Sequence, residues 1–153
     1  MILWRISNYA DLSGSGALLH SGRWHHRGRS VVYLAQSAAG ALLEALVHVE
    51  ASHPSELPRD YQLLEVDVPD DIGVADAALP AAVGGQPGPV PDVSATRRIG
   101  DQWLAGGSSL LLRVPSVVVG RTFNVLFNPA HPHAARCHIV SVARYPFDDR
   151  LVR

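Results

Sequence analysis

Cysteine is nearly absent and lysine is wholly absent from this sequence of 153 residues. Cys137 is the single cysteine, so an internal disulfide is excluded and a reducing compartment such as the cytoplasm is expected. All 13 basic residues are arginine. The formal net charge of −1 indicates no general attraction to nucleic acid or anionic lipid, so direct nucleic-acid binding is not expected.

Long apolar runs are also missing. No stretch approaches the roughly 18 consecutive apolar residues that a membrane-spanning helix needs, so no membrane association is expected. The first residues, MILWRISNYADL, do not show the basic segment followed by an apolar segment that marks a secretory signal. Both absences favour a cytoplasmic protein.

Several widespread catalytic signatures do not occur. The sequence contains no GxGxxG, no GxxxxGKS or GxxxxGKT, no GxSxG, and no HExxH or CxxC. Rossmann, P-loop, α/β-hydrolase and common zinc sites therefore lack their sequence signals. The eight histidines are not spaced as metal ligands usually are, so no metal is expected. Cys137 lies in an apolar run and is expected to be unreactive.

The residues that are present suffice for one domain. Hydrophobic residues make up 47% and charged residues 18% of the chain, which fits a single compact domain over 1–153 and argues against disorder. Apolar, β-branched and aromatic runs predict strands at 1–6, 31–36 and 61–69. Three later runs predict three more strands: SSLLLRVP, SVVVGRTFNVLFN and RCHIVSVARYPF.

Two helices are expected between these strands. Apolar residues at helical spacing predict a helix over 38–51 with Ser37 as its N-cap, and residues 95–107 predict a second helix ended by glycine. Residues 7–30 are expected to form a long functional loop, and the Pro/Gly-rich residues 70–94 a long ordered loop or flap. The order of elements predicts an α+β fold around a bent, mostly antiparallel sheet with flanking helices.

The segment SGRWHHRGRSVVYLAQS, residues 21–37, joins a basic loop to an apolar strand. Gly22 permits close backbone approach, Trp24 offers an aromatic wall, and the guanidinium of Arg23 matches the geometry of a phosphate. Arg23 is therefore either a surface charge or a pyrophosphate clamp. Arg5, directly after Trp4 in the first strand, is a second candidate for that contact.

Tyr33 and Glu44 lie inside apolar elements, where polar side chains need a reason. Tyr33 is either a core residue with its hydroxyl at an edge or a stacking platform for a flat ring. Glu44 lies in ALLEALVH, at the margin of the apolar stripe of its helix. It is either on the solvated face, where it can pair with His48 four residues later, or a carboxylate that lines a cleft.

Polar residues also interrupt the late apolar run RVPSVVVGRTFNVLFNPAHPH. Ser116 follows a proline inside a strand-like run, while Asn124, Asn128 and His131 punctuate its end. Turn or edge chemistry explains each of them, since NPAHP has the composition of a turn. Their residues alone do not separate that explanation from a role in binding.

Taken in order, the segments GRW, VVYLAQS, ALLEALVH, RVPSVVV and FNVLFNPAHP closely resemble the RES domain family. That family supplies the toxins of bacterial RES–Xre toxin–antitoxin pairs. No single segment is specific, but five in this order and at these separations are. The resemblance as a whole runs from Trp4 to Pro132, nearly the whole chain. The resemblance implies a fold similar to ADP-ribosyltransferases, which bind NAD+ in a cleft between bent antiparallel sheets.

The resemblance also implies roles for individual residues. The catalytic constellation of the family falls on Arg23, Tyr33 and Glu44. Glu44 is expected to stabilise the oxocarbenium-like transition state as nicotinamide leaves, Tyr33 to stack on nicotinamide, and Arg23 to grip the pyrophosphate. The full set of expected NAD+-binding residues is Arg5, Arg23, Trp24, Tyr33, Ser116 and Asn128, of which the last two would hydrogen-bond ribose or phosphate oxygens.

The expected activity is cleavage of NAD+ at the nicotinamide–ribose bond, with water or phosphate as acceptor. NAD+ is then a substrate, and no cofactor is expected. Two alternatives stay open: a mono-ADP-ribosyltransferase toxin that modifies a specific host protein, and a binding module with a vestigial cleft. The resemblance implies an Xre-type helix-turn-helix antitoxin that covers the active site, and a toxin dimer within that complex is a further possibility.

Overall fold

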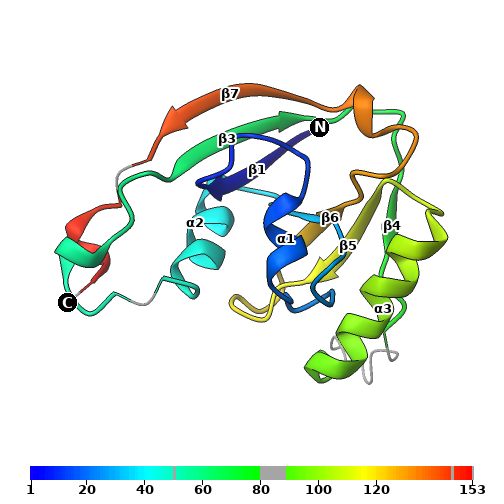
Figure 1. Ribbon diagram of the computed structural model, residues 1–153, viewed down its shortest axis with the longest axis horizontal. Coiled ribbons are helices and arrows are strands. Elements are labelled where there is room, and N and C mark those ends of the chain that lie inside the picture. Colours follow the sequence, from blue (N-terminus) through cyan, green and yellow to red (C-terminus); the bar gives the residue numbers. More distant parts are fainter. Residues whose placement is uncertain (50, 80–88, 146, 153) are drawn as a thin grey trace.

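The chain folds as an α+β domain around one seven-stranded sheet (Figure 1). A computed structural model describes residues 1–49, 51–79, 89–145 and 147–152. The strands are ordered β4-β5-β6-β2-β1-β3-β7, and the three α-helices lie on one side of the β7–β3–β1 part of the sheet (Figure 1). The expected α+β class is confirmed, with one continuous sheet where the resemblance implied more than one.

The bounds of the elements follow the apolar runs of the sequence. The strands are β1 (Ile2–Ser7), β2 (Val32–Ala35), β3 (Gln62–Asp67), β4 (Val74–Asp76), β5 (Leu111–Pro115), β6 (Phe123–Phe127) and β7 (His138–Arg144). The α-helices are α1 (Ser15–Leu19), α2 (Ala38–Leu46) and α3 (Val93–Gly106). Short 3₁₀ helices occupy η1 (Pro54–Glu56), η2 (Ala134–Arg136) and η3 (Asp149–Leu151).

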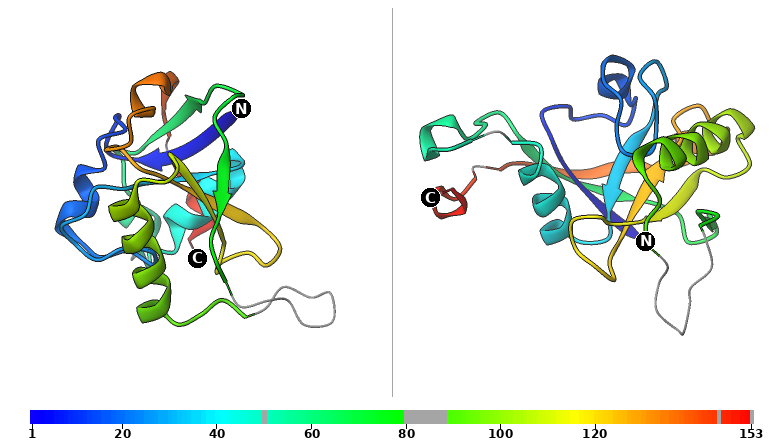
Figure 2. Two further views of the ribbon diagram at one scale, coloured as in Figure 1. Left: turned by 90° about the vertical axis from the view of Figure 1, so that its right-hand side faces the viewer. Right: turned by 90° about the horizontal axis from the view of Figure 1, so that it is seen from below.

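The sheet bends where β1 meets β2. Their antiparallel pairing is confined to Trp4 opposite Ala35, whereas β1 pairs with β3 along its whole length, from Ile2 to Ser7. The β7–β3–β1 part therefore diverges from the β2–β6–β5–β4 part, and the two run in different directions (Figure 2). Every described strand pair is antiparallel except β4 with β5. This divergence opens space beside β1 and β2.

Both longer helices begin at side-chain caps. Ser37 is extended and its side chain accepts a hydrogen bond from the Gly40 N–H, as predicted. Asp92 caps α3 in the same way, through the Ala95 N–H. Gly107, with a φ of 59°, ends α3 in the left-handed conformation that favours glycine.

The structure differs from the sequence predictions at three elements. Helix α2 ends at Leu46 instead of residue 51, because the chain tightens into i→i+3 bonds after it, from His48 N–H to Ala45 O and from Val49 N–H to Leu46 O. Helix α1 lies inside the expected loop 7–30, and its five residues are too few to show a helical period. Strand β4 lies inside the expected loop 70–94, of which residues 80–88 are outside the described chain.

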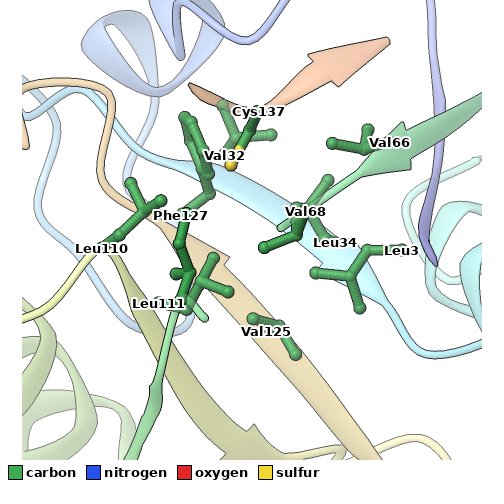
Figure 3. Packing of buried hydrophobic residues seen from close by; sticks show 11 residues of the cluster. Leu3, Val32, Leu34, Val66, Val68, Leu110, Leu111, Val125, Phe127 and Cys137 are labelled. Carbon is green, nitrogen blue, oxygen red and sulfur yellow. The ribbon is translucent and has the colours of Figure 1, made fainter. Parts of the chain in front are cut away.

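The main core lies under the centre of the sheet. Its buried side chains come from β1, β2, β3, β5 and β6 and from the segments that flank them: Leu3, Val32, Leu34, Val66, Val68, Ile72, Leu110, Leu111, Val125, Phe127 and Cys137 (Figure 3). Burial raises the pKa of the Cys137 thiol, as expected for an unreactive core cysteine. A second cluster under α3 contains Trp24, Val31, Trp103, Leu112, Val114 and Leu126. Across the described residues, no helix is long and apolar enough to cross a membrane.

Candidate active site

A cavity of about 430 Å³ lies where β1 and β2 diverge. Its lining comes from β1, the loop after α1, β2, α2, and the ends of β5 and β6. This volume is in the range of small-molecule and cofactor sites. Of the seven residues to which the family resemblance gave a role, five line it: Arg5, Arg23, Trp24, Tyr33 and Glu44.

Glu44 contributes the only carboxylate among the described residues that line this cavity. It is half-buried on α2, and its Oε1 accepts hydrogen bonds from Ser116 Oγ at 2.7 Å and from Asn124 Nδ2 at 2.7 Å. Within the described chain, no hydrogen bond reaches Oε2 and no ion pair joins Glu44 to His48. Glu44 therefore faces the cleft, with one oxygen held by the protein and the other available to a ligand.

Ser116 lies behind Glu44 and does not line the cavity. Its side chain is buried, with the residue 8% exposed, and its Oγ accepts from the N–H groups of Val118 and Val119, both at 3.1 Å. With its lone pairs engaged there, the hydroxyl proton is directed at Glu44. The structure thus places Ser116 as a support for the carboxylate, in contrast to the direct ribose or phosphate contact expected from the sequence.

Asn124 is a site residue that sequence reasoning did not assign. It lies on β6, paired with Ala35 of β2 on one side and Val114 of β5 on the other, and this central position points its amide at Glu44. The sequence marked Asn124 only as a polar interruption of an apolar run. A polar residue within a strand predicted to be buried was the signal available.

The hydroxyl of Tyr33 is held inside the protein. It accepts a hydrogen bond from the Trp24 N–H at 3.0 Å and lies 2.9 Å from Nδ1 of His25. Burial raises the pKa of Tyr33, so the phenol stays neutral. Because the hydroxyl is engaged in these contacts, the aromatic ring is the part of Tyr33 that can contact a ligand in the cavity.

Gly22 makes this arrangement possible. A Cβ at this position would lie 2.6 Å from the Tyr33 hydroxyl oxygen, and 2.7 and 2.8 Å from ring atoms of His25. Real Cβ atoms essentially never approach so closely, so a residue with a side chain would displace Tyr33 or His25. The close backbone approach expected from this glycine is therefore present, although it serves the neighbouring side chains.

Two arginines bring positive charge to the cavity. Arg23 donates from Nη2 to Pro91 O at 2.7 Å, while its buried Nε has no hydrogen-bond partner among the described residues. Arg5 donates from Nη1 to Asp11 O at 2.7 Å, and burial lowers its pKa. Over the described parts of the chain, neither guanidinium forms a salt bridge. Partly desolvated, uncompensated cations favour an anionic ligand such as a phosphate.

Helix α3 fixes the loop that carries Arg23. Thr96 Oγ1 donates to Arg23 O at 2.6 Å, Arg97 Nε donates to Gly22 O at 2.8 Å, and Asp101 accepts from the His26 N–H at 3.1 Å. Gly100 lies between these contacts: a Cβ there would lie 1.7 Å from Trp24 O. One face of α3 therefore presses directly against the loop backbone, more than 70 residues away in sequence.

Trp24 and Asn128 have mainly structural surroundings. Trp24 is 3% exposed and packs in the second core cluster, so its indole supports the loop from beneath while part of the residue borders the cavity. Asn128 is buried outside the cavity lining, and its Oδ1 accepts from the Ala130 N–H at 3.0 Å. That contact is the turn chemistry that the sequence left open for Asn128, and the residue is not among those that line the cavity.

Among the described residues, no group of three or more histidine, cysteine or carboxylate side chains is placed to hold a metal ion. The cavity lining offers one oriented carboxylate, two arginines, three histidines and several aromatic rings.

Comparisons with known proteins identify the family. The RES domain model matches residues 2–148. A protein of Pseudomonas putida named "Toxin Res" is 49% identical over 151 residues, which cover 99% of both chains. A protein of Sphingobium sp. named "Prs ADP-ribosylating toxin" is 38% identical over 159 residues, covering 98% of this chain and 96% of its own.

A solved structure supports the fold. The crystal structure described as the MbcT–MbcA toxin–antitoxin complex of M. tuberculosis matches with a TM-score of 0.66 at 19% identity, covering 98% of this chain and 85% of that chain. At this identity the match bears on the architecture alone. The family model and the sequence relatives span nearly the whole chain, and this protein belongs to the RES domain family.

Proposed function

We propose that the protein is the toxin of a toxin–antitoxin pair and that it cleaves NAD+ at the nicotinamide–ribose bond. The observation that carries the proposal is Glu44, a carboxylate held by Ser116 and Asn124 at the wall of a cavity of about 430 Å³, which is also lined by two arginines that form no salt bridge among the described residues. The names of its relatives support the toxin assignment.

In the proposed chemistry, the negative charge of Glu44 stabilises the transition state. As the bond from ribose to nicotinamide breaks, positive charge develops on the ribose, as in glycoside cleavage. A carboxylate oriented before the reaction stabilises that charge without having to reorganise. The two hydrogen bonds to Oε1 supply the orientation, and Oε2 is free to face the ribose.

Substrate binding is assigned to the remaining polar and aromatic lining. Arg23, whose Nε lacks a partner in the described chain, and Arg5 would hold the pyrophosphate. The ring of Tyr33 would stack on nicotinamide. Ser116 acts through Glu44, Trp24 supports the loop, and Asn128 shapes a turn outside the cavity. The substrate is NAD+ itself, and no separate cofactor enters the scheme.

The proposal allows more than one acceptor for the ADP-ribose group. Water or phosphate would make the protein a glycohydrolase or phosphorylase that depletes NAD+. The name of the Sphingobium relative supports a second candidate, transfer of ADP-ribose to a specific protein. Both candidates use the same Glu44-assisted departure of nicotinamide, so they differ only in what attacks the ribose.

NAD+ labelled in its adenine separates these candidates. Purified protein would be incubated with the labelled NAD+ in phosphate-free buffer, in phosphate buffer, and with a lysate of its host. We expect free ADP-ribose in the first case and a phosphorylated product in the second if phosphate is the preferred acceptor. Label on a discrete protein band, with little free product, would replace depletion by the protein-modifying reaction.

Replacing Ser116 by alanine should slow cleavage without removing the reaction. The carboxylate would lose one of its two donors, and a hydrogen bond to a charged group contributes about 1.5–3 kcal/mol, so we expect kcat to fall roughly 10- to 100-fold. Ser141→Ala, on the exposed strand β7, is the matched control and should retain the wild-type rate. Equal rates for wild type and Ser116→Ala, measured by nicotinamide release, would contradict the supporting role.

We also propose an antitoxin partner that covers the cavity, of the Xre helix-turn-helix type. The toxin names of the relatives support a partner, because a toxin made inside a cell needs neutralisation. A chain segment that inserts beside Arg23 would meet a guanidinium that forms no salt bridge among the described residues. If a purified complex turned over NAD+ at the rate of the free toxin, occlusion would be wrong.

A further inference from the structure

His25 is a buried histidine that the proposed reaction does not use. It is 2% exposed, yet both ring nitrogens have partners. Its Nδ1 lies 2.9 Å from the Tyr33 hydroxyl oxygen, and its Nε2 lies 3.0 Å from His20 O and 3.2 Å from Ala17 O. A buried imidazole with a partner at each nitrogen has a defined orientation.

These partners determine the tautomer of His25. Carbonyl oxygens only accept hydrogen bonds, so Nε2, which faces two of them, carries the proton. In the neutral ring Nδ1 is then an acceptor, and the Tyr33 hydroxyl must donate to it. The same hydroxyl accepts from the Trp24 N–H at 3.0 Å. A directed chain therefore runs from the Trp24 amide through Tyr33 and His25 to the carbonyls at the end of α1.

We propose that neutral His25 is a positioning residue that aims the ring of Tyr33 into the cavity. The inference rests on the proposed function, in which that ring supports nicotinamide. A hydroxyl fixed at its far end restrains the swing of the whole ring about the Cα–Cβ bond. Because the Trp24 amide is one residue from Arg23, the same contacts link the ring platform to the loop that carries the phosphate-binding arginine.

Packing alone does not account for this cluster. An aromatic side chain at position 25 would fill the same volume without accepting a proton from Tyr33. The His25 and Tyr33 rings are 5.7 Å apart between centroids and tilted by 54°, so they do not lie flat against each other. Gly22 has no side chain at the point where these two rings and its own backbone meet. The geometry therefore indicates that the hydrogen bond from the Tyr33 hydroxyl to His25 Nδ1, and not ring packing, holds these two side chains in place.

Protonation of His25 would reverse the direction of the hydrogen bond between Tyr33 and His25. Nδ1 would become a donor, and the Tyr33 hydroxyl, which already accepts from Trp24, would lose the acceptor of its own proton. Three groups contact the ring of His25: the Tyr33 hydroxyl on β2 and the carbonyls of Ala17 and His20. Two charged side chains on α3, Arg97 and Asp101, also influence its pKa.

Burial lowers the pKa of His25 from its ordinary value of 6.5. Below about pH 6.5 the unfolded chain therefore binds a proton that the folded chain refuses, and this histidine makes the folded state less stable as the pH falls. Above that pH the neutral network is fully formed. We expect NAD+ affinity to be constant from pH 7 to 8 and to weaken only in acid, as the pH passes through the lowered pKa.

The test combines a double-mutant cycle of NAD+ affinity with an NMR measurement of the His25 tautomer. All variants carry Glu44→Gln so that NAD+ is consumed only slowly, and the Kd of NAD+ is measured by calorimetry at pH 7.5. His25→Leu should weaken binding about tenfold, in line with the loss of one hydrogen bond. His25→Asn should restore most of the affinity, because the amide oxygen of asparagine falls near the position of Nδ1. In a Tyr33→Phe background, His25→Leu should have little further effect.

The ¹⁵N NMR spectrum of the His25 imidazole supplies the second arm. We expect protonated Nε2 and unprotonated Nδ1 at pH 7.5. A proton on Nδ1, or full additivity of His25→Leu and Tyr33→Phe in a chain that binds NAD+, would overturn the inference. A folded chain that binds no NAD+ would overturn both the inference and the proposed function. Coupled effects on binding, with no cleavage by wild type, would overturn the proposed reaction alone.

Discussion

We expect Glu44→Gln to lower the rate of nicotinamide release by about 10²- to 10³-fold, the usual loss when one preorganised electrostatic group is removed from a transition state. Glutamine keeps an oxygen that accepts from Ser116 and Asn124, so the two hydrogen bonds at 2.7 Å have a counterpart in the variant. The negative charge is what disappears. The loss should therefore appear in kcat, with KM for NAD+ nearly unchanged.

Glu65→Gln is the matched control for this substitution. Glu65 is half-buried on β3 and is not among the residues that line the cavity, so its neutralisation should leave the rate within about twofold of wild type. Both variants should unfold at temperatures close to that of wild type. If Glu44→Gln retained the wild-type rate, a carboxylate role in bond cleavage would be wrong, whatever the fold of the chain.

Gly100→Ala should destabilise the protein, although the same change usually stabilises an exposed helix interior. Alanine is favoured over glycine in a helix by about 0.8–1.0 kcal/mol. At position 100, however, the added Cβ would lie 1.7 Å from Trp24 O and 2.8 Å from the carbonyl carbon. Both atoms belong to the backbone, so α3 and the loop must separate. We expect a loss of about 1–3 kcal/mol or more in unfolding free energy.

Gly106→Ala on the same helix gives the opposite expectation. No atom lies within 4 Å of a Cβ at that position, so the helix propensity alone should operate and stability should be unchanged or slightly higher. Urea unfolding of the two variants measures the difference directly. NAD+ cleavage by Gly100→Ala should fall as well, because the displaced loop carries Arg23. A Gly100→Ala variant as stable as Gly106→Ala would show that α3 does not contact the loop as described.

Local sequence signals predicted much of the fold. Six of the seven strands, the Ser37 cap and the glycine after α3 follow from apolar runs and capping chemistry, which act over a few residues. Strand β4 is only three residues long and pairs in parallel with β5, so its existence depends on a distant partner. The end of α2 was also missed, because apolar periodicity marks the face of a helix better than its last residue.

The candidate site shows the same division between local and distant information. The family resemblance pointed to Arg23, Tyr33 and Glu44, and all three line the cavity. The residues that hold them were not assigned, because each contact crosses the chain: Ser116 and Asn124 reach Glu44 from 72 and 80 residues away. For Ser116 the family resemblance implied a ligand contact, but only the fold, which brings the residue after β5 next to Glu44, shows what its hydroxyl faces.

His25 illustrates a further limit of sequence reasoning. It belongs to a basic segment, GRWHHRGR, whose composition suggests a solvated loop. In the structure His25 is buried, whereas the adjacent His26 is exposed and its Nδ1 lies 2.7 Å from Asp101. Two identical neighbours thus have opposite environments. The difference arises because the His25 ring points inward to Tyr33 and to the carbonyls at the end of α1, whereas His26 points to Asp101 at the surface of α3.

Nicotinamide release from NAD+ by purified, antitoxin-free protein, with wild type and Glu44→Gln measured side by side, tests the central claim most directly. We predict steady release by wild type without any added protein, at a rate about 10²- to 10³-fold above that of Glu44→Gln. If folded wild type that binds NAD+ released no nicotinamide, with or without phosphate and host lysate, the assignment of this cavity to NAD+ cleavage would be contradicted.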